Sequence, residues 1–340
     1  MPRTPETSRG ISRRTGSRSR SPRPAKELSI AIVGAGRLGT ALGLALRASG
    51  YKIQVVAAQR PASARRAAKE FGPATMTLSA AQLSRLNSAQ LERINRCSLI
   101  LIATPDDVIA KVARQLAGLL TLEHSRGIKK ARRVVLHTSG ALAADALEPM
   151  RKAGFAVGSL HPLVSISESR SGSKALTQAF FSVEGDQIAV RAGKSLVKAL
   201  GGESFTIDSH CKALYHAAAL TASPNMTALF DIAVEMLGVC GLPRRRAQRI
   251  LLPLVQSTVA NLATQDPAKA LTGTFRRGDK STVLKHLAAL KTAHLPQALD
   301  AYVVLGQRSI AMAKKPGASP RLLNEIAQIL SRAAKASSRQ

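Results

Sequence analysis

Residues 28–39 read LSIAIVGAGRLG, a short apolar run that leads into three glycines, Gly34, Gly36 and Gly39. The apolar residues at 28–33 predict a strand that is buried on both faces of a sheet. A helix is predicted to follow over Arg37–Ser49 and to end at Gly50. A strand, a G-x-G-x-x-G turn and a helix in this order are typical of the first unit of a Rossmann-type α/β fold.

The glycine spacing also predicts a ligand. In a dinucleotide-binding turn the first glycine permits the tight turn, the second lets the pyrophosphate approach the backbone, and the third lets the helix pack on the strand. The N–H groups at the helix start then face the phosphate charge. A glycine-rich turn with a purely structural role is the alternative. The predicted cofactor contacts in this segment are Gly34, Gly36, Arg37, Leu38 and Gly39.

Strands and helices alternate through residues 28–207, which predicts a mostly parallel sheet with right-handed crossovers. The further predicted strands lie at 51–58, 98–103, 134–137, 155–161, 180–184 and 204–207. The further predicted helices lie at 63–71, 106–120, 141–153 and 187–200, and another helix is expected within 79–93. We therefore expect residues 28–207 to form a Rossmann NAD(P)-binding domain.

The pattern becomes helical from residue 208 onward. Helices are predicted over 212–238, 244–264, 280–290 and 297–313, so that residues 208–313 form an all-helical second domain for substrate binding and dimerisation. Residues 314–340 are expected to form a C-terminal extension, with one helix at 320–334 and a disordered end.

The composition favours a soluble, cytoplasmic protein. No apolar stretch approaches the roughly 20 residues that span a bilayer, and the first residues hold no apolar signal-peptide core. The three cysteines, Cys97, Cys211 and Cys240, lie far apart and match no metal-ligand spacing, so we predict no metal site.

The chain is strongly basic, with 50 Lys and Arg against 20 Asp and Glu. Residues 1–27 are rich in Arg, Ser and Pro, which predicts a disordered basic tail. A nucleic-acid-binding arm, an organellar transit peptide and a solvated extension all fit this tail. We favour the solvated extension, because scarce aromatic residues and the lack of a recognised module argue against nucleic acid as a partner.

The end of the second strand distinguishes the two dinucleotides. NAD-binding turns place an acidic residue there for the ribose 2′-hydroxyl, whereas this chain has Gln59 and Arg60, with Ser63 and Arg66 close behind. Arginine forks and a hydroxyl suit a 2′-phosphate, and the missing acid removes a repulsion. We therefore predict NADP rather than NAD as the cofactor, bound by these four residues; a solvated arginine-rich helix face is the alternative.

Several motifs together resemble one family. They read VGAGRLGTAL, LILIATPDDVI, VVLHTSGAL, GSLHPLVSIS, FFSVEGD, KALYHAAALTAS and LTGTFRRGDKSTVLKHLAAL, spread over about residues 28–310. The chain resembles predicted oxidoreductases that join a Rossmann-like domain to a domain of unknown function, family 2520. It is distantly similar to pyrroline-5-carboxylate reductase and ketopantoate reductase.

This resemblance implies where the site lies. By analogy with the reductases, Thr104 and Pro105 at the end of a strand would line the nicotinamide ribose. Ser139 and His161 end two further strands and would contact nicotinamide or substrate. Ligands of such sheets bind outside the carboxyl ends of the strands, which agrees with this placement.

A proton donor must accompany hydride transfer to a carbonyl or imine. His216 is the leading candidate, because by resemblance it takes the place of the catalytic lysine of ketopantoate reductase. His161 is a second candidate, and Lys212 lies one helical turn before His216 on the same face. A histidine held by a core hydrogen bond is the structural alternative for His216.

Two positions depart from the family pattern. The family usually has Ser-Asn where this chain has Ser223, Pro224 and Asn225, so Asn225 is the remaining amide for substrate binding. The usual LTGP is LTGT here, but Arg277 follows and could bind a substrate carboxylate. A solvated loop charge is the alternative for Arg277.

We thus predict an NADP-dependent oxidoreductase that binds a small, anionic carbonyl or imine compound between its two domains. The resemblance also implies a homodimer formed through the helical domain. The alternative function is a non-catalytic NADP-binding sensor or scaffold, which the Pro224 departure favours.

Overall fold

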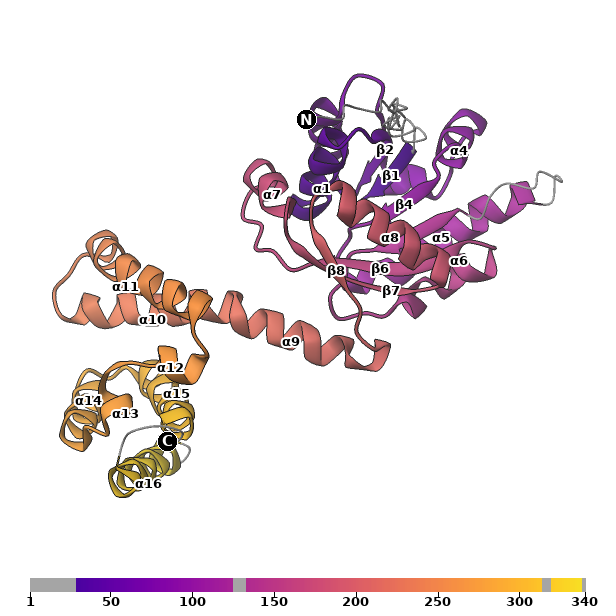
Figure 1. The fold of residues 1–340 in the computed structure, drawn as a ribbon. Coiled ribbons are helices and arrows are strands. Elements are labelled where there is room, and N and C mark those ends of the chain that lie inside the picture. Colours follow the sequence, from indigo (N-terminus) through magenta and orange to yellow (C-terminus); the bar gives the residue numbers. More distant parts are fainter. Residues whose placement is uncertain (1–28, 125–132, 314–318, 338–340) are drawn as a thin grey trace, which may run out of the picture. The chain divides into compact units, whose positions relative to one another are not determined.

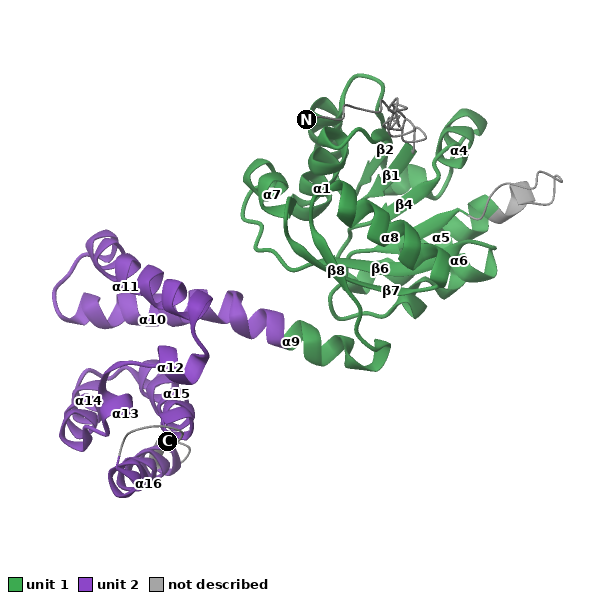
Figure 2. Ribbon diagram, in the orientation of Figure 1, with its two compact units in different colours: residues 1–217 green, residues 218–340 purple. Residues whose placement is uncertain are grey.

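The computed structural model describes residues 29–124, 133–313 and 319–337. The predicted basic tail at 1–27 and the last residues of the C-terminal extension lie outside these ranges. Figure 2 shows that the chain divides into two compact units, residues 1–217 and 218–340. Each unit is described by itself below.

The first unit is built on one eight-stranded sheet in the order β3-β2-β1-β4-β5-β6-β7-β8. The first six strands in this order are parallel, β7 runs antiparallel to β6, and β8 is parallel to β7. This confirms the predicted α/β, Rossmann-type, mostly parallel sheet. The strands are β1 (Ser29–Val33), β2 (Lys52–Ala58), β3 (Met76–Ser79), β4 (Leu99–Ile102), β5 (Val134–His137), β6 (Ala156–Pro162), β7 (Phe180–Gly185) and β8 (Glu203–Phe205).

Helices cover both faces of this sheet (Figure 1). The helices on one face are α1 (Arg37–Ala48), α2 (Pro61–Phe71), α7 (Ser169–Leu176) and α8 (Gln187–Ala199), which share one apolar core. On the other face lie α3 (Ala80–Leu83), α4 (Ser88–Asn95), α5 (Asp106–His124), the 3-10 turn η1 (Ala144–Leu147) and α6 (Glu148–Lys152).

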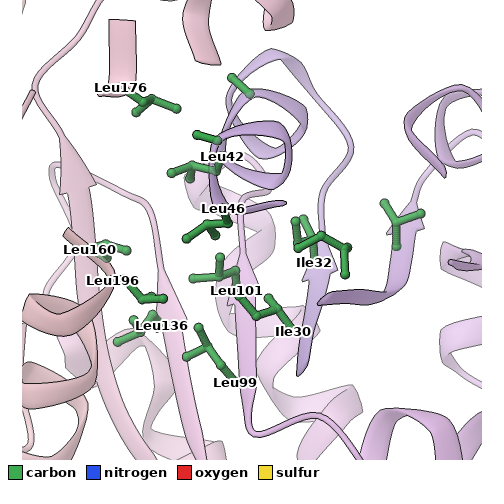
Figure 3. Close-up of a cluster of buried hydrophobic side chains, with 14 of the residues drawn as sticks. Ile30, Ile32, Leu42, Leu46, Leu99, Leu101, Leu136, Leu160, Leu176 and Leu196 are labelled. Atoms are coloured by element: carbon green, nitrogen blue, oxygen red, sulfur yellow. The ribbon is translucent and has the colours of Figure 1, made fainter. Parts of the chain in front are cut away.

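Strand β1 shows why the sequence runs apolar without alternation. Ile30 and Ile32 point into the first core, which Figure 3 shows in close-up with Leu42 and Leu46 of α1. The intervening residues of β1 join the second core on the opposite face. A strand with no solvent-facing side needs apolar residues at every position.

Three helical segments of the first unit differ from the prediction. The helix expected within 79–93 is two short helices, because Ser79 and Asn87 each form a capping box that starts a new helix, and strand β3, which was not predicted, precedes them. The helix predicted at 141–153 is only η1 and α6. Helix α7 had no counterpart in the prediction, because its sequence SRSGSKAL is short and polar.

Helix α9 (Lys212–Ala222) begins in the first unit and ends in the second (Figure 2). The single helix predicted at 212–238 is wrong, because α9 ends before Ser223 and α10 (Pro224–Val239) begins at Pro224. Proline has no N–H to continue a helix and disfavours the helical conformation of the preceding residue. Ser223 accordingly has φ −128° and ψ −74°.

The second unit is helical throughout its described residues, as predicted. Its core lies between the last three helices, with Val283, Val303 and Leu330 among the buried residues. The predicted helix at 320–334 is confirmed and extends three residues further, to Ser337. After α10 the helices are α11 (Arg244–Thr264), α12 (Pro267–Ala270), α13 (Gly273–Arg277), α14 (Lys280–Thr292), α15 (Pro296–Ala313) and α16 (Pro320–Ser337).

Candidate functional site

The glycine turn between β1 and α1 is held by close backbone packing. Gly34 has φ +114°, and a Cβ there would lie 2.3 Å from the carbonyl oxygen of Ala103. A Cβ on Gly39 would lie 1.9 Å from the carbonyl oxygen of Gly34. No side chain fits at either position, so these two glycines are required by the fold itself.

Gly36 differs from the other two glycines of the motif. Its φ is −76°, which any residue adopts, and no described atom lies within 4 Å of where its Cβ would be. Neither backbone conformation nor packing therefore demands glycine there. Gly36 is also the N-cap of α1 and provides no side-chain cap for the first N–H groups of the helix. An open N-terminus beside a missing side chain fits a phosphate group that approaches the backbone.

A cavity of about 670 Å³ extends from this turn along the ends of β1, β2 and β4. Gln59, Arg60 and Ser63, which the sequence assigns to the cofactor, line it, and its lining holds no acidic residue of the described ranges. Apolar side chains from α3 and α5, Leu83 and Val108 among them, form another part of its wall. A polar end and an apolar wall suit the ribose and the adenine of a dinucleotide.

A second cavity, of about 430 Å³, lies on the other side of the turn. It gathers residues that follow or end three neighbouring strands, β4, β5 and β6, together with one residue of α9. Thr104, Ser139 and His161 thus line one cavity, and their contact with a cofactor or substrate stays a prediction. The predicted site residues that line it are Gly36, Arg37, Leu38, Thr104, Pro105, Ser139, His161 and His216.

Two histidines stand close together in the wall of this second cavity. The ring centroids of His161 and His216 are 5.5 Å apart, and the rings are nearly perpendicular. A Cβ on Gly140 would lie 2.4 Å from Nδ1 of His216 and 2.7 Å from Nε2 of His161. Gly140 therefore leaves the space that both rings occupy.

Two polar atoms beside this cavity have no partner. Nδ1 of His216 and Oγ1 of Thr104 are both buried, and neither forms a hydrogen bond within the described part of the chain. Buried polar atoms are nearly always paired, so an unpaired atom at a cavity wall is available to a ligand.

His161 and His137 are held in the neutral form. Burial, followed by the charge of Lys212, lowers the pKa of His161 to about 4. Burial likewise lowers the pKa of His137 to about 4. The Ser139 N–H donates to Nδ1 of His137 at 3.2 Å, so the other ring nitrogen, Nε2, donates to the Ala143 carbonyl at 3.0 Å. Both rings are therefore uncharged near neutral pH.

Lys212 lies beneath the second cavity rather than in its wall. Its side chain is almost completely buried, and Nζ donates to Oγ of Ser159 at 2.8 Å and to the Ser139 carbonyl at 3.3 Å. Burial lowers the pKa of the ammonium group, while the carboxylates of Glu184 and Asp106 oppose that change.

The Ser139 hydroxyl is engaged in shaping the turn after β5. It donates to Oδ2 of Asp106 at 2.8 Å and accepts hydrogen bonds from the N–H groups of Ala141 and Leu142. These bonds connect the end of β5 to the start of α5. Ser139 therefore reaches the cavity already fixed in orientation.

The remaining predicted residues lie elsewhere. Arg66 lines a smaller cavity next to the turn. Asn225 and Arg277 belong to the second unit, where both are exposed on α10 and α13. Their assignment to substrate binding stays a prediction.

Sequence reasoning missed several residues of the site. The Tyr215 hydroxyl lies 2.7 Å from Nδ1 of His161. Tyr215 directly precedes His216 in the YHAAA motif, and this position next to a candidate residue could have indicated that Tyr215 belongs to the site. His137 and Asp106 also lie in quoted motifs, HTSGAL and TPDD. Ser159 is a polar residue in the middle of a buried strand, and only the tertiary structure reveals its partner.

The fold and its glycine turn define a Rossmann-like protein. Residues 14–162 match the model of a Rossmann-like domain, and residues 179–309 match the model of the domain of unknown function DUF2520. The two matches together confirm the predicted pairing of a Rossmann-like domain with this domain of unknown function. No curated protein matches it.

Solved structures resemble the chain over nearly their whole lengths. A proposed NADP oxidoreductase from Bacteroides fragilis is 21% identical with a TM-score of 0.66, covering 83% of this chain and 98% of its own. A protein from Thermotoga maritima is 21% identical with a TM-score of 0.56, covering 92% and 100%. An imine reductase from Myxococcus stipitatus in complex with NADP+ is 15% identical with a TM-score of 0.56, covering 91% and 94%. At these identities the likeness establishes the fold.

None of the helices in the described ranges is long and apolar enough to cross a membrane.

Proposed function

We propose that this protein is an NADP-dependent oxidoreductase that reduces a small carbonyl or imine compound, or oxidises the corresponding product. The observation that carries this proposal is the second cavity, which is lined by the glycine turn, His161 and His216. Two buried polar atoms beside it, Oγ1 of Thr104 and Nδ1 of His216, form no hydrogen bond within the described residues. The similar structures support it, because they include a proposed NADP oxidoreductase and an imine reductase in complex with NADP+.

The residues present fit a dinucleotide. Gly36 would receive the pyrophosphate at the open N-terminus of α1, and Gln59, Arg60 and Ser63 would hold the 2′-phosphate end. The bound cofactor would supply or accept the hydride at the second cavity. The absence of an acid at the end of β2 supports NADP over NAD.

The two histidines have different roles in this proposal. Burial raises the pKa of Tyr215 to about 12, so its hydroxyl keeps its proton, and we assign this hydroxyl as the donor to Nδ1 of His161. Nε2 of His161 then carries the ring proton, which lies toward Gly140 and the cavity. A neutral imidazole N–H in that position orients and polarises the substrate carbonyl or imine.

His216 is the proton donor in this proposal. Its Nδ1 is unpaired within the described residues, and the ring lines the cavity beside His161. Lys212 acts through its charge, which adds to the effect of burial in lowering the pKa of His161, and it does so without lining the cavity. Asn225 and Arg277 are proposed substrate contacts, with Arg277 suited to an anionic group.

The second unit supports a homodimer. Helix α11 exposes large apolar side chains, with Ile250, Leu254 and Val259 about half exposed or more. Ala247 is its only fully buried residue within the described chain. An apolar surface of this kind is usually covered by a partner, and we propose a second copy of this chain.

Cofactor titration followed by turnover assays tests the proposed function. We expect the purified full chain to bind NADPH more tightly than NADH and to oxidise NADPH with one compound of a keto-acid and imine panel. The variant His216→Asn should retain NADPH binding and lose turnover, whereas His210→Asn, at an exposed histidine outside the cavities, should change neither. Binding of neither cofactor would refute the proposal, and NADPH binding without turnover would favour the sensor or scaffold alternative.

A further inference from the structure

A third cavity, of about 360 Å³, opens beside the glycine turn between α1, α2 and the start of α7. Three arginines line it: Arg37 from α1, Arg66 from α2 and Arg170 from α7. Hydroxyl groups of Thr40, Ser63 and Ser169 are also in its lining, and Glu70 is its one acidic residue among those described. The lining is therefore cationic and rich in hydrogen-bond donors.

This cavity is a side branch of the cofactor site. It shares Ala35, Gly36 and Ser63 with the 670 Å³ cavity. It shares Gly36 and Arg37 with the 430 Å³ cavity. A ligand that runs along the turn from one large cavity to the other could therefore place one substituent in this branch. The three arginines require that substituent to be an anion.

Helix α7 closes the outer side of the branch. It lies in the connection between β6 and β7, the antiparallel pair of the sheet, and packs beside α1 (Figure 1). The Ser169 hydroxyl donates to the carbonyl oxygen of Arg37 at 3.2 Å. Nη2 of Arg170 donates to Oε1 of Glu70 at 2.7 Å. These two contacts attach the start of α7 to the glycine turn and to α2.

The Glu70 pairing places the Arg170 guanidinium at the cavity. Arg170 is highly exposed, with 80% of its side chain accessible, so an ion pair on its own would contribute little to stability. Its planar group presents several N–H donors, and the contact with Glu70 leaves others for a second anion.

We propose that this branch receives the 2′-phosphate of NADP and that Arg170 of α7 determines the preference for NADP over NAD. This inference rests on the proposed function. A phosphate monoester carries close to two negative charges and three acceptor oxygens, which match arginine forks and hydroxyl donors. Ser63 lines both the branch and the 670 Å³ cavity, so it connects this phosphate to the end of β2. Helix α7 thus adds to the 2′-phosphate recognition that is predicted from the residues after β2.

Isothermal titration with paired ligands tests this assignment. The ligands are NADPH and NADH, and 2′,5′-ADP and 5′-ADP, each measured with the full chain. For Arg170→Ala we expect the Kd values of NADPH and 2′,5′-ADP to rise about fivefold to tenfold. The Kd values of NADH and 5′-ADP should change less than twofold, because these ligands lack the 2′-phosphate.

Two further variants make the result specific. Arg170→Lys keeps the charge without the planar fork and should recover part of the lost affinity. Arg191→Ala removes an exposed arginine of α8 that lines none of the three cavities, and should leave all four Kd values unchanged. An equal loss for all four ligands, or no loss in Arg170→Ala, would overturn the inference while leaving the proposed function standing. If the wild-type chain binds neither NADPH nor NADH, both fail together.

Discussion

The ammonium group of Lys212 donates a hydrogen bond to the hydroxyl of Ser159 at 2.8 Å. The Ser159 hydroxyl in turn donates to the Ser139 carbonyl at 3.2 Å, so α9, β6 and the end of β5 meet in one buried polar network. Within the described chain, the acceptors of the Lys212 ammonium group are a hydroxyl and a carbonyl oxygen, and neither is a carboxylate. Its charge therefore acts on the neighbouring histidines through a weakly screened interior.

Removal of that charge should raise the pKa of His161. In Lys212→Met the positive charge that disfavours protonation of His161 is lost, and we expect its pKa to rise by about one unit. NMR titration of the histidine ring protons measures this directly, and a merely structural role of Lys212 would not shift it. Lys194→Met, at an exposed lysine of α8, serves as the control and should leave the titration unchanged.

Two glycines of the same turn should respond oppositely to alanine. Gly36→Ala places its methyl group in open space, so the free energy of unfolding should change by less than about 0.5 kcal/mol while the Kd for NADPH rises at least about tenfold. Gly39→Ala forces a methyl group against the Gly34 carbonyl and should destabilise the fold by at least about 2 kcal/mol. Urea unfolding and cofactor titration separate the effects. Unimpaired NADPH binding by Gly36→Ala would argue against a phosphate at this position.

Acid should destabilise the first unit through its neutral histidines. The pKa values of His137 and His161 are about 4 in the folded chain, below their ordinary value of 6.5. The unfolded chain therefore binds more protons between pH 6.5 and pH 4, so stability is full above pH 6.5 and is lost as pH falls through this window. Urea unfolding at intervals from pH 7 to pH 5.5 measures the loss before most carboxylates titrate.

One variant isolates the histidine contribution to this pH dependence. His161→Asn removes one of the two depressed pKa values, and the fall in unfolding free energy between pH 7 and pH 5.5 should become about half as steep. A profile that is flat in the wild type would contradict neutral burial of these rings.

A charge on the exposed face of α11 should break the proposed homodimer. Leu254 is 65% exposed, and Leu254→Glu would place a carboxylate within an apolar interface, which should weaken dimerisation at least about tenfold. Light scattering with size-exclusion chromatography reports the mass of the species. Gln256→Glu adds the same charge at an exposed polar position of the same helix and should remain dimeric. A wild-type protein that is monomeric would contradict the proposed homodimer.

The elements that the sequence predicted well carry strong local signals. Strand β1 is apolar and buried from Ile30 to Val33 because both of its faces are covered, and the three glycines mark the turn after it. Helix α11 was predicted with the observed bounds, Arg244–Thr264, because the Gly241–Pro243 turn precedes it. The strand ends that carry Thr104, Ser139 and His161 could also be expected to converge, since parallel strands end at one edge of the sheet.

Other elements carry weak local signals or depend on tertiary context. Helix α7 is short and polar, and its position is set by packing on α1 and by the contacts of Ser169 and Arg170. The break between α9 and α10 follows from Pro224, although the apolar residues on both sides resemble one continuous helix. The role of Ser159 depends on Lys212, which lies 53 positions away in the chain.

The sequence by itself determined the class of fold, the glycine turn and the residue types at the strand ends. The reason is local: a required backbone conformation selects glycine, and burial on both faces of the sheet selects apolar residues. The tertiary structure alone decided that Lys212 lies under the cavity, that His161 and His137 are neutral, and that Arg170 of α7 pairs with Glu70 of α2. These properties arise from desolvation and from contacts between distant segments, and both depend on which residues the fold brings together.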